Sequence, residues 1–288
     1  PYLMPNEQIL LAPQEVLQRL ADPDWVIVDC RFDLADPEAG RRSYEGGHIP
    51  GAIFLDLDQD LAGPVTPASG RHPLPDPETL AEKLGNLGVG KSHQIVVYDG
   101  GHGAVAARAW WILRWLGHDD VRLLDGGLAC WETQTLPLRG GSEDVTATVF
   151  RPSVRDEWVL STTELAEDTT AVGAFKLLDA RDRPRFRGEV EPIDPVAGHI
   201  PGASNLPFTD FLRDDGTWRP LSERAALIED ALGADRDVRW SVMCGSGVTA
   251  CHLAISGLEA GFREPRLYVG SWSEWIRDPK RPVGSGKS

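Results

Sequence analysis

Short apolar runs recur along the chain, and each is followed by a turn and then by apolar residues at helical spacing. The runs at 25–29, 94–99 and 121–125 predict strands, and the spacing within 104–116 predicts a helix with one apolar face. Asp76 before Pro77 predicts the start of another helix, with Asp76 as its cap. The polar stretch 30–44 is expected to be irregular, and 60–76 is expected to be a Pro- and Gly-rich loop.

The same order of motifs occurs a second time, about 144–151 residues later. The run ending at Asp179 matches the run ending at Asp29, and the turn Gly-His199-Ile-Pro-Gly-Ala matches Gly-His48-Ile-Pro-Gly-Ala. Ser222 and Glu223 are expected to cap a helix through Leu232, as Asp76 does in the first half. Alternating strands and helices in each copy predict an α/β fold: two tandem domains, each a mostly parallel sheet with helices on both faces.

A polar, glycine-containing stretch between 134 and 157 predicts the connection between the copies. We therefore expect an N-terminal domain over residues 1–140, a linker over 141–157 and a C-terminal domain over 158–288. Because the first copy has Asp99 where the second has Cys244, we expect only the C-terminal domain to carry a nucleophile. The active site is then expected at the interface between the domains.

Cys244 lies between the apolar run that ends at Met243 and a helical pattern that begins near Val248. Gly245 and Gly247 allow the backbone to curl with its N–H groups pointing inward, and a helix N-terminus adds partial positive charge. Such a turn stabilises a thiolate, so Cys244 is the candidate nucleophile. The alternative interpretation of any lone cysteine before a helix is a small buried apolar side chain, and this is the favoured interpretation of Cys251.

Composition narrows the class of partner. The formal net charge is −15, which argues against a nucleic-acid or anionic-membrane partner. Four cysteines without metal-ligand spacing predict a reducing compartment, and no metal or cofactor is expected. No signal peptide and no run long enough to span a membrane is found, so we expect a cytoplasmic protein.

The chain resembles the two-domain rhodaneses, a family of sulfurtransferases. The resemblance extends over roughly residues 8–283 and depends on both His-Ile-Pro-Gly turns, on Arg185-Phe-Arg-Gly188 and on Gly-Ser-Trp272-Ser-Glu-Trp275. The loop Cys244-Gly-Ser-Gly-Val-Thr249 is similar to that of 3-mercaptopyruvate sulfurtransferases, whereas thiosulfate-using relatives often have a basic residue at the position of Ser246. Thiosulfate:cyanide sulfurtransferase activity and a non-enzymatic sulfur carrier or scaffold are the alternatives.

The resemblance implies that the Cys244 thiolate takes sulfur from mercaptopyruvate as a persulfide, and that thioredoxin, another thiol or cyanide removes it. It implies Ser246 as the hydroxyl that moves protons, assisted by a His and an Asp of the first domain, for which His48 and Asp36 are the candidates. It implies that the backbone of Gly245, Gly247, Val248 and Thr249 holds the persulfide and that Arg185 binds the substrate carboxylate. The mercaptopyruvate enzymes usually have a second carboxylate-binding arginine shortly before the second Gly-His-Ile-Pro motif. In this chain Asp194 or a neighbour takes that position, and Arg187 is the candidate substitute.

Two other enzyme classes share single features with this chain. Gly101-His-Gly103-Ala-Val-Ala106 approaches a dinucleotide-binding fingerprint, but it is also explained as the degenerate copy of the Cys244 loop. A cysteine-dependent phosphatase would need an arginine about six residues after the nucleophile, where this chain has Ala250. His199, in the turn equivalent to that of His48, is expected to be structural, and Arg181 is expected to pair with a carboxylate such as Asp182.

Overall fold

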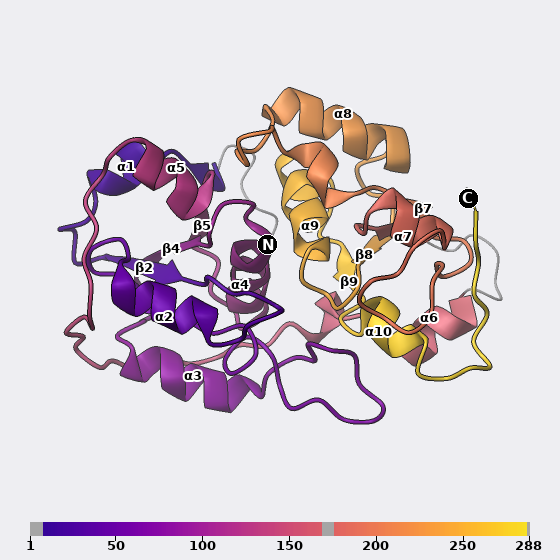
Figure 1. Cartoon of the computed structure of the whole chain (residues 1–288), viewed down its shortest axis with the longest axis horizontal. Coiled ribbons are helices and arrows are strands. Elements are labelled where there is room, and N and C mark those ends of the chain that lie inside the picture. Colours follow the sequence, from indigo (N-terminus) through magenta and orange to yellow (C-terminus); the bar gives the residue numbers. More distant parts are fainter. Residues whose placement is uncertain (1–7, 169–175, 287–288) are drawn as a thin grey trace.

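The computed structural model describes residues 8–168 and 176–286, which are arranged as two lobes side by side (Figure 1). The first lobe contains a wholly parallel sheet in the order β1-β5-β4-β2-β3. Its strands are β1 (Leu10–Leu11), β2 (Trp25–Asp29), β3 (Ile53–Phe54), β4 (Gln94–Tyr98) and β5 (Val121–Leu124). Its helices are α1 (Pro13–Leu17), α2 (Ala39–Gly46), α3 (Pro77–Asn86), α4 (Ala104–Trp115) and α5 (Gly127–Thr133).

The second lobe repeats this plan with a parallel sheet in the order β7-β6-β8-β9. Its strands are β6 (Lys176–Asp179), β7 (Ser204–Asn205), β8 (Trp240–Met243) and β9 (Arg266–Leu267). Its helices are α6 (Thr162–Asp168), α7 (Arg183–Arg187), α8 (Leu221–Leu232), α9 (Ala250–Glu259) and α10 (Ser271–Trp275), with 3-10 turns η1 (Asp156–Trp158) and η2 (Phe208–Phe211). The order β9-β8-β6-β7 is that of β5-β4-β2-β3, so the predicted α/β fold and its duplication are confirmed.

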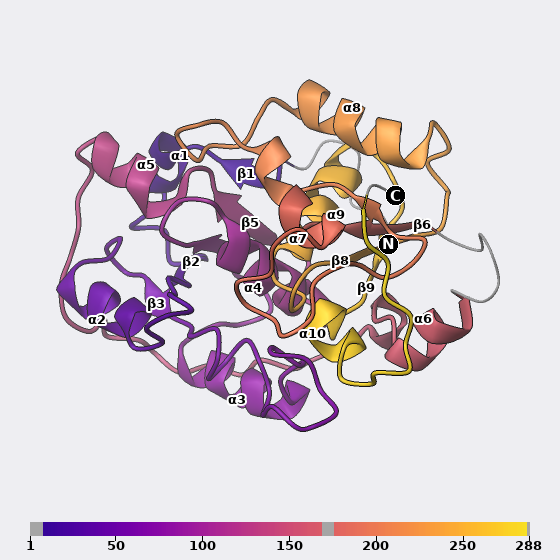
Figure 2. The ribbon, with the colours of Figure 1, turned by 45° about the vertical axis from the view of Figure 1, so that its right-hand side comes forward.

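The two lobes meet along α4 and α9, which pack against each other at the centre of the molecule in both views (Figures 1 and 2). Both helices are buried along most of their length, and one hydrophobic cluster contains residues of both. Each helix follows the loop at the end of the matching strand, β4 or β8. The interface therefore places the loop of Cys244 next to the first lobe.

Some local predictions were wrong. The polar stretch expected to be irregular contains α2, whose Gly40 lies so close to the Arg31 carbonyl that a Cβ there would be 1.9 Å from its oxygen. This helix has few apolar residues, so periodicity gave no signal. Helix α8 begins at Leu221 with Pro220 at its cap position and no side-chain cap, which contradicts the cap predicted at Ser222. Asp76 does cap α3, because its carboxylate accepts a hydrogen bond from Thr79 N.

The stretch predicted as a linker follows the surface of the first lobe. Thr148 N donates to Gly85 O, and Ser153 N donates to Leu116 O, at 2.8 Å each. The domain boundaries themselves stay a prediction, and their parts at 1–7, 169–175 and 287–288 lie outside the described residues. Among the described helices, none is long and apolar enough to cross a membrane.

Candidate active site

Cys244 follows β8 directly and is 2% exposed. Its Sγ accepts a hydrogen bond from Gly247 N at 3.1 Å, and such a bond favours an anionic sulfur. Gly247 has a φ of 74°, and a Cβ there would lie 2.7 Å from Val269 O. The tight turn that aims this amide at the sulfur therefore requires glycine.

Helix α10 holds the loop from the other side. Trp272 N donates to Cys244 O at 3.0 Å, and Ser273 N donates to Gly245 O at 2.9 Å. Ser273 Oγ also accepts from Arg71 N of the first lobe at 3.0 Å. The Gly-Ser-Trp-Ser motif thus fixes the Cys244 loop and a loop of the first lobe against each other.

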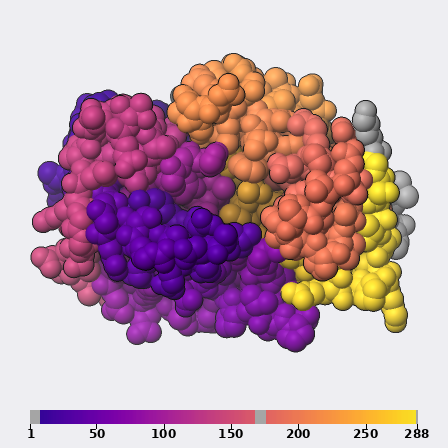
Figure 3. Space-filling model, in the orientation of Figure 1, coloured from indigo at the N-terminus to yellow at the C-terminus, as the bar shows by residue number. Residues whose placement is uncertain are grey.

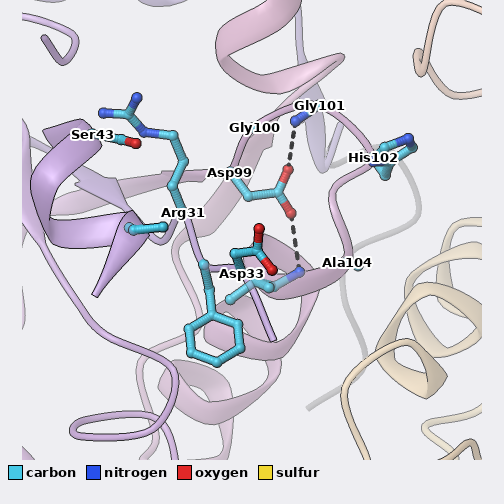
Figure 4. A pocket seen from close by; sticks show the side chains of 12 residues that line it. Arg31, Asp33, Ser43, Asp99, Gly100, Gly101, His102 and Ala104 are labelled. Carbon is cyan, nitrogen blue, oxygen red and sulfur yellow. Dashed lines mark hydrogen bonds between the residues drawn. The ribbon is translucent and has the colours of Figure 1, made fainter. Parts of the chain in front are cut away.

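The equivalent loop of the first lobe shows what this kind of turn binds. The carboxylate of Asp99 accepts hydrogen bonds from the backbone N–H groups of Gly101, Gly103, Val105 and Ala106 at 3.0–3.2 Å. Figure 4 shows two of these bonds, including the one from Gly101. Gly103 has a φ of 71°, which matches that of Gly247. An acidic side chain already fills this ring of amides, so they are not free to bind a pyrophosphate, and this argues against the dinucleotide interpretation.

His72 of the first lobe lies against the nucleophile loop. Its Nδ1 is 2.8 Å from Ser246 Oγ, and both side chains are buried. Burial and the nearby cations of Arg108 and Arg71 lower the pKa of His72 to about 3, so the ring is neutral at neutral pH. Asp58 Oδ1 lies 3.3 Å from Nε2, although the contact is not aligned as a hydrogen bond. Burial, together with Asp56, raises the pKa of Asp58.

The predicted contact of His48 with Ser246 is wrong. Both ring nitrogens of His48 are occupied elsewhere, Nδ1 by Tyr44 O at 2.7 Å and Nε2 by Glu143 Oε1 at 3.1 Å. The ring stacks on Tyr44 at 4.0 Å. His199 repeats this arrangement, stacked on Phe186 at 3.9 Å with Nδ1 2.7 Å from Phe186 O, as its predicted structural role requires.

Asp36 is also misplaced by the sequence interpretation. It is exposed and forms an ion pair with Arg42 at 2.5 Å, and the hydrogen bond from Arg42 lowers the pKa of this carboxyl group. The structure instead places His72 next to Ser246, and Asp58 next to His72.

The sequence repeat contains an indication of the role of His72 that the family motifs do not. His72-Pro-Leu corresponds to Arg219-Pro-Leu in the second half, at an offset within the range of the other matches. The neighbouring Trp218 lies against Gly103 of the first lobe, where a Cβ would be 3.1 Å from its Nε1. In each lobe, the loop next to this Pro-Leu pair thus contacts the turn that follows the central strand of the other lobe. In the first lobe, this contact puts His72 beside Ser246.

Two guanidinium groups lie over Gly245. A Cβ on Gly245 would be 3.3 Å from Arg71 Nη2 and 3.5 Å from Arg185 Nη2. Arg185, from α7, is therefore where the prediction requires it, whereas Arg187 is 3.9 Å from Glu189 and is replaced at the site by Arg71. Arg181 pairs with a nearby carboxylate as predicted, but the partner is Asp179, at 2.7 Å, rather than Asp182.

Arg108 of α4 connects these loops from below. It is fully buried and donates to Gly247 O at 2.9 Å, to His72 O at 3.0 Å and to Leu61 O at 3.2 Å. No ion pair to a carboxylate is formed by this side chain within residues 8–168 and 176–286. Its charge is satisfied by backbone carbonyls alone, and Arg108 thereby joins the Cys244 loop to the loop of His72.

The surface is hollowed between the lobes (Figure 3). A cleft of about 520 Å³ lies beside His72 in the first lobe. It is lined by polar and apolar residues of that lobe, namely Leu34, Asp58, Gln59, Ala62, Gly63, Pro64, Val65, Arg71 and His72. This volume suits a small anionic molecule rather than a polymer.

Comparison with known proteins agrees with the geometry. The model of the rhodanese-like domain matches residues 12–134 and again residues 161–278. The chain belongs to the rhodanese-like family. Over 282 residues, 96% of this chain and 98% of the relative, it is 50% identical to a Pseudomonas aeruginosa protein named "Probable 3-mercaptopyruvate sulfurtransferase".

Other members of the rhodanese-like family give the same picture of the fold. A Mycobacterium tuberculosis relative, SseB, named as a candidate thiosulfate sulfurtransferase, is 39% identical over 97% of this chain and 98% of its own. The crystal structure of SseA from Escherichia coli, described as a 3-mercaptopyruvate sulfotransferase, superimposes with a TM-score of 0.81 at 32% identity. It covers 93% of this chain and all of that one. The names of these relatives include two sulfur donors, mercaptopyruvate and thiosulfate.

Proposed function

We propose that the protein transfers sulfur from 3-mercaptopyruvate to a thiol through a persulfide on Cys244, with release of pyruvate. The observation that carries the proposal is the pair Ser246–His72, joined at 2.8 Å two residues beyond the nucleophile. A hydroxyl at this position can move the proton that a thiol donor must lose, whereas thiosulfate has no such proton to move at neutral pH.

In the first half-reaction the Cys244 thiolate attacks the donor sulfur. A sulfur–sulfur bond forms, the bond between sulfur and C3 of the donor breaks, and its electron pair stays on C3 as the enolate of pyruvate. The proton of the donor thiol passes to that carbon, so pyruvate leaves and an anionic persulfide stays on the enzyme. Gly247 N lies where it stabilises the developing charge, in the manner seen around Asp99.

Ser246 and His72 carry the proton in this step. His72 is neutral, so Nδ1 can accept the Ser246 hydroxyl hydrogen while Nε2–H faces Asp58. The hydroxyl oxygen is then able to accept the proton of the donor thiol and to pass it to the enolate. The donor's carboxylate is bound by Arg71 and Arg185 over Gly245, since guanidinium forks match a planar anion.

In the second half-reaction an acceptor thiolate attacks the outer sulfur of the persulfide and regenerates the Cys244 thiolate. Thioredoxin, another thiol or cyanide serves as the acceptor. We place the reaction in the cytoplasm, because all four cysteines are free thiols and Cys244 must stay reduced to react.

Parallel steady-state assays with mercaptopyruvate and with thiosulfate, each with cyanide as acceptor, test the proposal. The expected result is the higher kcat/KM with mercaptopyruvate and complete loss of transfer in Cys244→Ala. A clear preference for thiosulfate would instead identify a thiosulfate sulfurtransferase, and undetectable release of pyruvate would favour a carrier or scaffold.

A further inference from the structure

The two guanidinium groups over Gly245 are already bound to a carboxylate of the chain itself. Asp194 Oδ1 accepts from Arg71 Nη1 at 2.9 Å, and Oδ2 accepts from Arg185 Nη2 at 3.1 Å. The Asp194 side chain is only 4% exposed. One carboxylate thus bridges two arginines from different lobes, with one oxygen on each.

A second acidic side chain adds to this arrangement. Glu191 accepts from Arg185 Nε at 2.9 Å and from the backbone N–H of Asp194 at 3.1 Å. Burial opposes the charge of Glu191, yet the hydrogen bonds from Arg185 and Asp194 N keep its pKa below the usual range. Two arginines and two carboxylates make a set with no net charge, directly beside the nucleophile loop.

We propose that Asp194 is a specificity-determining residue: an internal carboxylate that occupies the place of the donor's carboxylate on Arg71 and Arg185 and must be displaced when an anionic donor binds. This inference rests on the proposed function. Displacement is physically feasible, because Asp194 belongs to the loop between α7 and β7, whose Val190, Ile193 and Val196 are exposed. The competition raises KM for a carboxylate-bearing donor and leaves the sulfur chemistry at Cys244 unchanged.

The variant that isolates the competing charge is Asp194→Asn, which keeps the shape of the side chain. Its KM for mercaptopyruvate is expected to fall about tenfold at unchanged kcat, the scale of one charge-assisted hydrogen bond. The KM for 1-mercapto-2-propanone, which keeps sulfur and ketone but has no carboxylate, is expected to stay the same. Asp210→Asn is the matched control, because it removes an Asp–Arg pair with Arg183 on the surface of the same lobe.

An unchanged or higher KM for mercaptopyruvate in folded Asp194→Asn would overturn the proposal, since Asp194 would then only position the arginines. Equal falls with the two donors, or in Asp210→Asn, would overturn it as well. A readout without turnover separates this from the proposed function. The pyruvate concentration that half-protects Cys244 from iodoacetamide is expected to fall about tenfold in Asp194→Asn. If the wild type never releases pyruvate, the proposed function is wrong. Independently of that result, equal protection of Cys244 by pyruvate in the wild type and in Asp194→Asn would refute the competition between Asp194 and the donor carboxylate.

Discussion

Replacing Arg108 by methionine tests whether one buried cation holds the catalytic loops together. The substitution removes the guanidinium donor of three buried carbonyl groups, those of Gly247, His72 and Leu61, and a longer contact with Pro73 O at 3.4 Å. Each such group costs about 1–3 kcal/mol, together about 3–9 kcal/mol, and the recovered hydration of one guanidinium offsets several kcal/mol. We expect the free energy of unfolding to fall by about 3 kcal/mol, measured by urea denaturation with tryptophan fluorescence.

Activity is expected to fall further than stability alone explains. Arg108 joins the carbonyl of Gly247 to that of His72, so its loss lets the nucleophile loop and the proton-transfer pair drift apart. A displacement of about 1 Å costs about 100-fold in rate, so kcat/KM of the folded variant is expected to fall by about that factor. Alkylation of Cys244 by iodoacetamide at neutral pH is expected to slow in parallel.

Arg114→Met supplies the matched control. Arg114 is on the same helix, is equally buried and also crosses to the second lobe, but it binds Glu264 at 3.0 Å rather than the catalytic loops. The Arg114→Met variant should be less stable than the wild type, but its folded fraction should keep a kcat/KM close to the wild-type value. If Arg108→Met keeps wild-type kcat/KM, or if Arg114→Met loses as much activity as Arg108→Met, the positioning role of Arg108 is refuted.

Three further predictions follow from the site. In mercaptopyruvate assays, His72→Gln is expected to lower kcat by about 100-fold or more. His48→Gln should lower the melting temperature but keep kcat within a few-fold of the wild type. The reverse pattern would identify His48, and not His72, as the proton-transfer group. Cys251→Ala should keep most of its transfer activity, because burial raises the pKa of this thiol far above neutral pH; loss of sulfur loading at Cys244 in this variant would contradict that. Burial lowers the pKa of both His72 and His252 to about 3, while the unfolded value is about 6.5. The unfolded state therefore takes up protons first, and each histidine should remove about 2 kcal/mol of stability between pH 7 and pH 5. Urea denaturation at both pH values should show a loss that is about 2 kcal/mol smaller in His252→Gln than in the wild type, and an equal loss in the two proteins would refute the assignment.

The sequence was sufficient for most of the strands and for the turn that holds Cys244, because these depend on local patterns. Strands β2 and β4 were predicted from their apolar runs, and Cys244 from the glycines beside it. The repeat was visible since both copies keep the Gly-His-Ile-Pro-Gly turn, whose histidine packs on a neighbouring ring in each lobe. That structural reason for the motif is also why His48 misled the assignment of the proton-transfer group.

The residues that were missed reach the site across the domain interface. His72 is 174 residues from Ser246 in sequence and lies in a loop without periodic pattern. Arg71 replaces a family arginine from a different lobe, so no motif near Asp194 could indicate it. Contacts of this kind depend on how the two complete lobes pack against each other, and the local sequence around each residue does not determine that packing.

Cys244 is proposed to receive the sulfur from the donor. Mass spectrometry of the protein after treatment with mercaptopyruvate, digested without reductant, measures this directly. We expect a peptide containing Cys244 that is heavier by one sulfur atom and returns to its original mass when cyanide is added. A peptide of unchanged mass, or added sulfur found on Cys30, Cys130 or Cys251 instead, would contradict it.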